Sequence, residues 1–210
     1  RQMCIRDSEY GADAVRAYIL FLGPPEKEKL WNEDGLPGMY KFLNRLWRQV
    51  HDLCGKAGDE TLFAQKPADE AAVAAAKKLI RERHRVVEKV SADIERNNFN
   101  TAIAAIMELV NASGDYLRKN APAARDAELG RDVAETIVKL LAPMAAHFSE
   151  ELWHTVLGHE GSVHNEAWPT YDPEMAKADE VELAVQVNGK VKARITVTAD
   201  AADAAIVEEA

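Results

Sequence analysis

The amino-acid sequence predicts a mainly α-helical protein, in which a helical bundle is followed by a partial α+β module made of a β-hairpin and a helix. Apolar residues recur every three or four positions through most of residues 9–157, which is the spacing of one face of a helix. No alternating strand pattern interrupts that region, so its helices are expected to pack on one another. Strict apolar–polar alternation appears later, at 181–197, and predicts the hairpin.

Composition and charge narrow the class of protein. The chain has 210 residues, of which 47% are hydrophobic and 29% charged, as is ordinary for a soluble globular protein. The net charge of −9 repels phosphate, so contact with nucleic acid must use local basic patches, and a free-standing DNA-binding protein is disfavoured. Cys4 and Cys54 lack the CxxC spacing of zinc sites and indicate no disulfide framework. No membrane span or signal peptide is evident, so a cytoplasmic location is expected.

Six helices are expected in the bundle. Glycine and two prolines at 23–25 end the first, and Asn100 is expected to cap the fourth by accepting from its first-turn amides. Trp31, in the first loop, is expected to be a packing anchor. Pro143 removes a backbone donor inside an apolar pattern, so two helices or one kinked helix are expected there, ending at Gly158. The expected ranges are about 10–22, 36–55, 69–96, 101–119, 126–142 and the stretch from Pro143 to 157. The second helix is expected to bury a stripe made of Leu36, Tyr40, Leu43, Trp47, Val50 and Cys54.

The hairpin segment 181–197 has its apolar residues at odd positions on both arms. A two-residue loop of Asn188 and Gly189 would pair odd with even positions and put the two apolar faces on opposite sides. A three-residue loop at 187–189 pairs even with even, so we predict that loop, with Glu182 facing Arg194 across the strands. A helix is expected after Asp200. Because a hairpin and one helix cannot close a core, residues 181–210 are expected to be loosely held.

Several separated segments share a pattern with one family of enzymes. Residues 141–153 read Leu-Ala-Pro-Met-Ala-Ala-His-Phe-Ser-Glu-Glu-Leu-Trp, and Ser-Val-His and Trp-Pro follow before 170. The other segments are Tyr-Gly-Ala-Asp-Ala-Val-Arg at 10–16, the segment 38–48, Phe-Asn-Thr-Ala-Ile-Ala at 99–104 and Val-Gln-Val-Asn-Gly-Lys-Val at 185–191. Together they resemble the class I aminoacyl-tRNA synthetases for leucine, isoleucine and valine. The hairpin favours the leucine-specific, bacterial-type members. Ala146 stands where the family usually has a second proline.

The resemblance implies a domain layout and a division of labour. Residues 9–157 would be the anticodon-binding helical bundle, 158–178 a linker and 179–210 a truncated C-terminal α+β domain. Residues 1–8 fit no family pattern and are expected to be non-native or disordered. A parent enzyme of this type activates leucine with ATP and Mg and transfers it to tRNA(Leu). The Lys-Met-Ser-Lys-Ser activation loop is absent here, so this piece is expected to position tRNA, with no catalysis and no cofactor of its own.

The partners implied by the resemblance are tRNA(Leu) and the catalytic and editing domains of the same chain, without DNA or a membrane. Two alternatives stay open. One is the corresponding region of a valyl or isoleucyl enzyme. The other is a non-enzymatic helical scaffold or interaction module.

Two sets of cations are candidate tRNA contacts. Lys41, Arg45 and Arg48 step by four and three residues along a helix face that differs from the apolar stripe. A basic face of this kind either only solvates the helix or contacts phosphates. The second set shares the polar face of the predicted hairpin, and contacts to phosphates and RNA shape are expected rather than base readout. This second set is Lys190, Lys192 and Arg194.

Two further groups are expected to be structural. Glu151 and His154 have the Glu-x-x-His spacing that di-iron bundles use in pairs, but without a second copy a solvated or hydrogen-bonded His154 is favoured. His147 and Glu151 lie one turn apart without a third ligand, so no metal site is predicted. A basic cluster interspersed with acids is expected to be a solvated face with local ion pairs. It consists of Arg81, Arg83, His84, Arg85 and Lys89.

Overall fold

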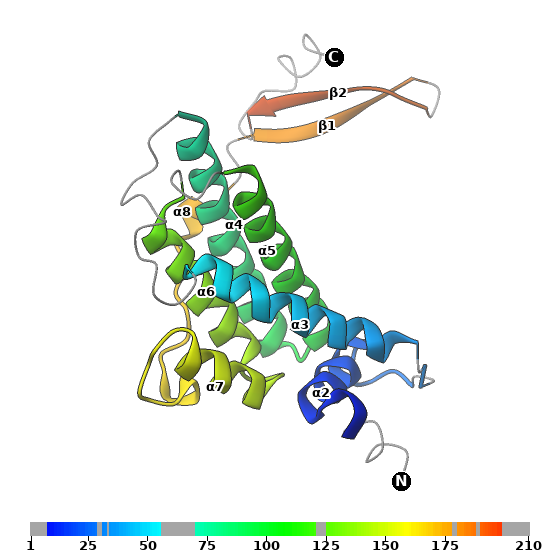
Figure 1. Ribbon diagram of the computed structural model, residues 1–210. Helices are drawn as coiled ribbons and strands as arrows, with labels where there is room; N and C mark the ends of the chain where they lie inside the picture. Colours follow the sequence, from blue (N-terminus) through cyan, green and yellow to red (C-terminus); the bar gives the residue numbers. More distant parts are fainter. Residues whose placement is uncertain are drawn as a thin grey trace.

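In the part of the chain that the structure describes, six α-helices form a bundle, followed by a return segment and a β-hairpin (Figure 1). The computed structural model describes residues 8–28, 31–32, 34–55, 70–120, 125–177, 180–187 and 190–198, the last two ranges in their backbone only. Of the segment 1–8 that was expected to be non-native or disordered, residues 1–7 lie outside the described residues, whereas Ser8 is helical. The loops at 56–69 and 121–124 and the helix expected after Asp200 also lie outside the described residues. None of the described helices is long and apolar enough to cross a membrane.

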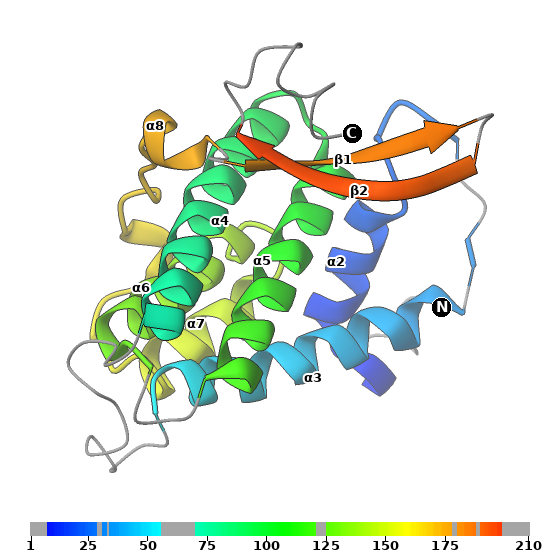
Figure 2. The ribbon, with the colours of Figure 1, turned by 90° about the horizontal axis from the view of Figure 1, so that it is seen from above.

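The helices confirm the predicted fold class, and their ends lie close to the expected positions. Helices α4 and α5 lie side by side, and α3 crosses α5 and α6 (Figures 1 and 2). Side chains from all six helices meet in one hydrophobic core. The elements are α2 (Ala12–Phe21), α3 (Gly35–Leu53), α4 (Glu70–Glu95), α5 (Phe99–Lys119), α6 (Ala127–Leu141), α7 (Ala146–Thr155), the 3₁₀ turn η3 (Val163–Asn165), α8 (Pro173–Ala176), β1 (Glu180–Val187) and β2 (Lys190–Thr198).

The predicted apolar stripe of α3 is only partly buried. Leu36, Leu43 and Val50 lie in the core, but Tyr40 is 42% exposed and Trp47 is half-buried. The stripe prediction was wrong at these positions because α3 is apolar on two adjoining faces, and a heptad-like pattern cannot tell which face the bundle takes. The core instead takes the residues one position earlier, Met39, Leu46 and Leu53.

Pro143 separates two helices, which resolves the alternative that the sequence left open. Helix α6 ends at Leu141 and α7 begins at Ala146, joined by a turn in which the Met144 amide donates to the Leu141 carbonyl at 2.9 Å. The residue before α7 is an alanine, which has no side chain able to cap it. Asp13 of α2 supplies the cap from a distance, because its Oδ2 accepts from the Phe148 amide at 2.6 Å.

The fourth expected helix, α5, begins two residues early, so Asn100 is not its cap. Helix α5 starts at Phe99, and Asn98 at the N-cap position makes no side-chain cap. The preceding Asn97 has φ 59, a left-handed conformation that asparagine tolerates better than most residues. That left-handed turn ends α4 and reverses the chain directly into α5, which leaves no room for the longer capped loop that we predicted.

The hairpin reaches the predicted parity by a different route. Val187 pairs with Lys190 across a two-residue connection, but the partner of Gln186 is Val191 whereas that of Val185 is Ala193. Lys192 is therefore an extra residue, and the resulting β-bulge restores odd-with-odd pairing along the rest of the strands. The predicted three-residue loop and the Glu182–Arg194 pair are wrong, since Glu182 lies opposite Thr196 and Arg194 opposite Ala184. The β-bulge, and not a longer loop, brings the apolar residues of the two strands to the same face of the hairpin.

Removing the Asp13 carboxylate should destabilise the bundle more than removing a surface carboxylate. The side chain of Asp13 is 10% exposed and caps α7 from another helix. Asp13→Ala should lower the free energy of unfolding of the chain in urea by about 1–2 kcal/mol, the usual range for a lost cap. Asp115→Ala is the matched control, because Asp115 is 51% exposed and, among the residues that the structure describes, pairs with the neighbouring Arg118 on the same helix. Equal effects of the two substitutions would contradict the remote cap.

Candidate nucleic-acid interface

Helix α3 presents the first predicted set of cations to solvent. Lys41, Arg45 and Arg48 are all exposed, and they lie about 80–140° around the helix from Tyr40. We call these three residues the α3 ridge. The structure thus confirms that the ridge is a face of its own, separate from the core.

The ridge cations have no carboxylate partner among the described residues. Arg48 Nε donates to the Asn44 carbonyl at 3.3 Å, and the Arg45 guanidinium lies 5.8 Å from the centre of the Phe42 ring. Both contacts leave the positive charge uncompensated. Such a surface keeps its attraction for phosphate even in a protein whose net charge is negative.

The cations of α4 are in the opposite situation. Arg83 pairs with Asp132 at 2.6 Å, and Lys89 with Asp93 at 3.2 Å. Arg85 is held between Glu82 and Glu108, and the hydrogen bonds that its guanidinium donates to these carboxylates raise its pKa. For these three residues the structure confirms the expectation of local ion pairs, so Arg83, Arg85 and Lys89 offer little free positive charge for a nucleic acid.

The second predicted set of cations lies on β2. Lys190 and Arg194 are in paired positions of the strand, and Lys192 is the bulged residue. The prediction that all three share one face relied on unbroken alternation, and the bulge interrupts that alternation within the set. We call these three residues the β2 set.

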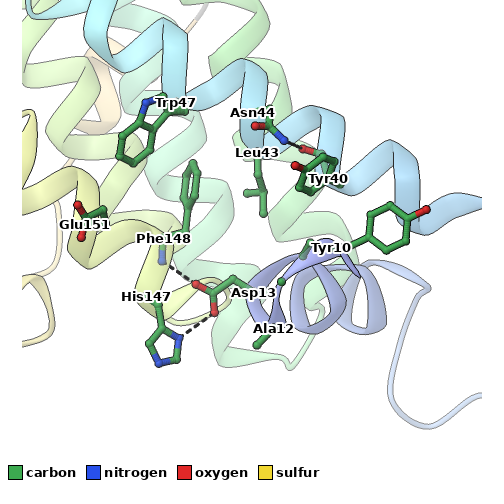
Figure 3. A pocket seen from close by; sticks show the side chains of 12 residues that line it. Tyr10, Ala12, Asp13, Tyr40, Leu43, Asn44, Trp47, His147, Phe148 and Glu151 are labelled. Carbon is green, nitrogen blue, oxygen red and sulfur yellow. Dashed lines mark hydrogen bonds and ion pairs between the residues drawn. The ribbon is translucent and has the colours of Figure 1, made fainter. Parts of the chain in front are cut away.

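An open groove runs beside the ridge, between α2, α3 and α7 (Figure 3). Its volume is about 590 Å³. Tyr10 and Tyr40 meet there edge to face at 5.6 Å, and Trp47 meets Phe148 at 5.9 Å. Asn44 belongs both to the groove and to the side of α3 that leads to the ridge. The sequence analysis missed this groove, although the signal was available: Tyr40 and Trp47 are the two largest aromatic side chains of the predicted stripe.

Polar groups of the groove meet where the first and last helices of the bundle touch. Asp13 accepts from the Phe148 amide and lies 3.2 Å from His147 Nδ1, as Figure 3 shows, and Arg16 lies 3.4 Å from both Asp13 and His147. The groove therefore joins two of the segments that carried the sequence resemblance. The carboxylate of Asp13 is occupied by these contacts.

The histidine of the Glu-x-x-His spacing is hydrogen-bonded on both ring nitrogens. His154 Nδ1 lies 2.7 Å from the His159 carbonyl, and His154 Nε2 lies 3.2 Å from Glu150. Glu150 also accepts from Ser162 Oγ and from the Val163 amide. Partial desolvation raises the pKa of Glu150, but these hydrogen bonds outweigh it, so the net effect is a lowered pKa. These contacts hold the turn after α7 and make His154 structural, as the favoured interpretation expected.

Among the described residues, neither thiol chemistry nor metal binding is favoured. Burial raises the pKa of the Cys54 thiol to about 11, so little of it is thiolate at neutral pH. Within the described ranges, no group of three His, Cys, Asp or Glu side chains is placed to hold a metal ion. What the described side chains offer is a binding surface: an unpaired cationic ridge and an aromatic groove beside it.

Comparison with known proteins identifies the family. A family described as the anticodon-binding domain of tRNA ligase matches residues 76–208. The leucine–tRNA ligase of Geobacter sp. (strain M21) is 44% identical over 193 residues, which are 91% of this chain and 23% of that protein. The leucine–tRNA ligase of Fervidobacterium nodosum is 41% identical over 202 residues, with 93% and 23% covered.

A solved structure agrees with the sequence comparisons. The ternary LeuRS–tRNA–LeuAMS complex of Agrobacterium radiobacter K84 is similar with a TM-score of 0.69 and 31% identity, over 98% of this chain and 25% of that one. The chain thus spans about a quarter of the length of the relatives that it matches. Since the family match covers well over half of its residues, the chain belongs to the tRNA ligases that carry this anticodon-binding domain.

Proposed function

We propose that this chain is the tRNA-binding part of a leucine–tRNA ligase, and that it holds the body of tRNA(Leu) while leucine is attached elsewhere in the protein. The observation that carries the proposal is the α3 ridge: three exposed cations without a carboxylate partner among the described residues, in a chain that matches a tRNA ligase family over residues 76–208. Both relatives named above are leucine–tRNA ligases, which supports leucine over isoleucine or valine.

The ridge would bind the phosphate backbone. Three cations spaced by four and three residues span about 10 Å along a helix, and each can neutralise one phosphate. Phosphate contacts fix where the RNA lies without reading its bases. The β2 set would add a second contact from the module that follows the bundle. Two separate contacts define the orientation of a rigid RNA better than one.

The chemistry of leucine activation would belong to the rest of the protein, together with its ATP and Mg. The activation loop of the family is absent from this sequence. The described residues supply a surface for binding, and the cytoplasm, where tRNA is charged, is the proposed location.

Neutralising the ridge should weaken tRNA binding and flatten its salt dependence. Lys41→Ala, Arg45→Ala and Arg48→Ala together remove three phosphate contacts, so the slope of log K against log salt should become shallower by about 2–3 between about 50 and 200 mM salt. The measurement is binding of a tRNA(Leu) transcript by fluorescence anisotropy.

The matched control removes the same charge from another face. Lys77, Lys78 and Lys119 are exposed on α4 and α5. Changing all three to alanine should leave the salt slope nearly unchanged. If the control weakens binding as much as the ridge variant does, binding depends on net charge and the ridge is not the contact.

The β2 set gives a second, independent prediction. Lys190→Ala, Lys192→Ala and Arg194→Ala together should also reduce affinity and salt slope. The charge-retaining exchange Lys190→Arg, Lys192→Arg and Arg194→Lys should bind tRNA(Leu) nearly as the unchanged chain does. A fully folded alanine variant with unaltered affinity would show that these charges serve solubility alone.

The chain by itself should not activate leucine. Leucine-dependent exchange of pyrophosphate into ATP should stay at background with the purified chain, because the activation loop is missing. Exchange above background that tracks the chain through purification would overturn this division of labour.

A further inference from the structure

The segment that leads from the bundle to the hairpin is held along α4 by three side chains. We call residues 166–177 the strap; it includes α8, which lies beside α4 in Figure 1. Trp168 Nε1 donates to Ser91 Oγ at 2.8 Å, and an Arg83 guanidinium nitrogen donates to the Thr170 carbonyl at 3.2 Å. The third contact runs the other way: the backbone amide of Asp172 donates to His84 Nδ1 at 3.0 Å. This segment lies within the range 158–178 that the sequence predicts to be a linker.

Only one of the three contacts depends on a proton near neutral pH. Ser91 Oγ donates to the Val87 carbonyl at 2.7 Å and is thereby oriented to accept from Trp168. Arg83 stays charged at any relevant pH and is also fixed by Thr136 at 3.0 Å. His84 accepts through Nδ1, which an imidazole can do only when that nitrogen carries no proton. A protonated ring would turn an N–H towards the Asp172 amide, and two donors cannot bond.

The surroundings of His84 favour the neutral ring. Burial lowers the pKa of His84, and the adjacent Arg83 on α4 lowers it further. The carboxylates of Asp172 on the strap and Asp132 on α6 act in the opposite direction but do not prevail. Because the folded-state pKa lies below the ordinary value, the contact is fully present above that value and is lost as pH falls through the lowered pKa.

We propose that His84 is a positioning residue, which in its neutral form latches the strap to α4 and so fixes the point from which the hairpin module leaves the bundle. Lys177 is the last residue of the strap and β1 begins at Glu180, so the chain between them can span at most about 11 Å. A latched strap therefore confines the start of the hairpin to a small region. Without the latch, the Ser91 and Arg83 contacts still hold Trp168 and Thr170, but the chain from Asp172 onwards is held less tightly and the hairpin can start from a wider region.

This inference extends the proposed function, on which its consequence for tRNA rests. The α3 ridge is fixed in the bundle, whereas the β2 set follows the strap. Simultaneous contact by both sets requires a set distance between them, so losing the latch lowers the effective concentration of the second set at the RNA. Acidification should weaken tRNA binding through His84.

Hydrogen exchange of the strap amides in the 210-residue chain tests the latch directly. Between about pH 7.5 and about pH 5, and after correction for intrinsic exchange rates, protection of the Asp172 amide should fall about fivefold, the size expected for one hydrogen bond. His84→Asn is the decisive variant, because its Oδ1 takes the place of Nδ1 as an acceptor but does not titrate. It should keep protection at both pH values. His84→Ala should lose protection at both.

A second control separates the latch from general loosening. Ser91→Ala removes the Trp168 contact and should weaken the strap near 168 equally at both pH values. The latch is overturned if His84→Asn loses as much protection on acidification as the unchanged chain, or if the unchanged chain loses none.

The tRNA measurement distinguishes the two proposals. The positioning role is supported by two results together: strap protection falls on acidification through His84, and tRNA affinity falls over the same pH range in the unchanged chain but not in His84→Asn. If exchange titrates while affinity follows the same pH course in both, the latch exists but does not position tRNA. If the chain fails to bind tRNA at neutral pH, the proposed function is wrong, and the exchange result alone decides the latch.

Discussion

The carboxylate of Asp13 joins the two ends of the bundle. It lies on α2 and accepts from the backbone of α7, so one interaction connects residues 135 positions apart in sequence. Helix α7 needs this partner because Pro143 cuts it off from α6 and Ala145 at its N-cap has no capping group. With α7 fixed, Trp153 and Leu152 reach the core, and the turn after α7 can be held by Glu150. Asp13, His147 and Phe148, which meet at this contact, also line the aromatic groove.

A division between paired and unpaired cations organises the surface. The protein is acidic overall, and Arg83, Arg85 and Lys89 of α4 form ion pairs that tie α4 to α6, to α5 and to itself. The ridge of α3 differs from these three residues because its cations have no carboxylate partner in the described part of the chain. Net charge is therefore a poor guide to whether a protein binds RNA, since the field near one helix face depends on local pairing.

Much of the bundle could be predicted from the sequence, because helix periodicity and the position of proline are local signals. The choice of helix cap and of partners across strands is not set by such local signals, and the predictions of both were wrong. Asn100 was expected to cap α5, yet the left-handed Asn97 started the helix earlier. The hairpin's parity was correct because buried faces must coincide, but a bulge and a longer loop satisfy that rule equally well, and the structure uses the bulge at Lys192.

The candidate site shows the same limit. The exposure of Lys41, Arg45 and Arg48 followed from helix geometry, but their lack of acidic partners among the described residues depends on which helices pack nearby. The contacts of the strap were hidden for a similar reason: His84 was read as part of a solvated basic cluster, and nothing in its own helix indicates that a backbone amide 88 residues away donates to it.

Lysine footprinting of the unaltered chain on tRNA(Leu) determines whether the α3 ridge lies against RNA. Acetylation of each lysine, measured by mass spectrometry with and without RNA, reports which ammonium groups lie against phosphate. We expect tRNA(Leu) to protect Lys41 strongly from acetylation, while the exposed Lys77 and Lys78 of α4 should react at the same rate with and without tRNA(Leu). Equal reactivity of Lys41 with and without bound tRNA(Leu) would contradict the assignment of the α3 ridge as the nucleic-acid interface.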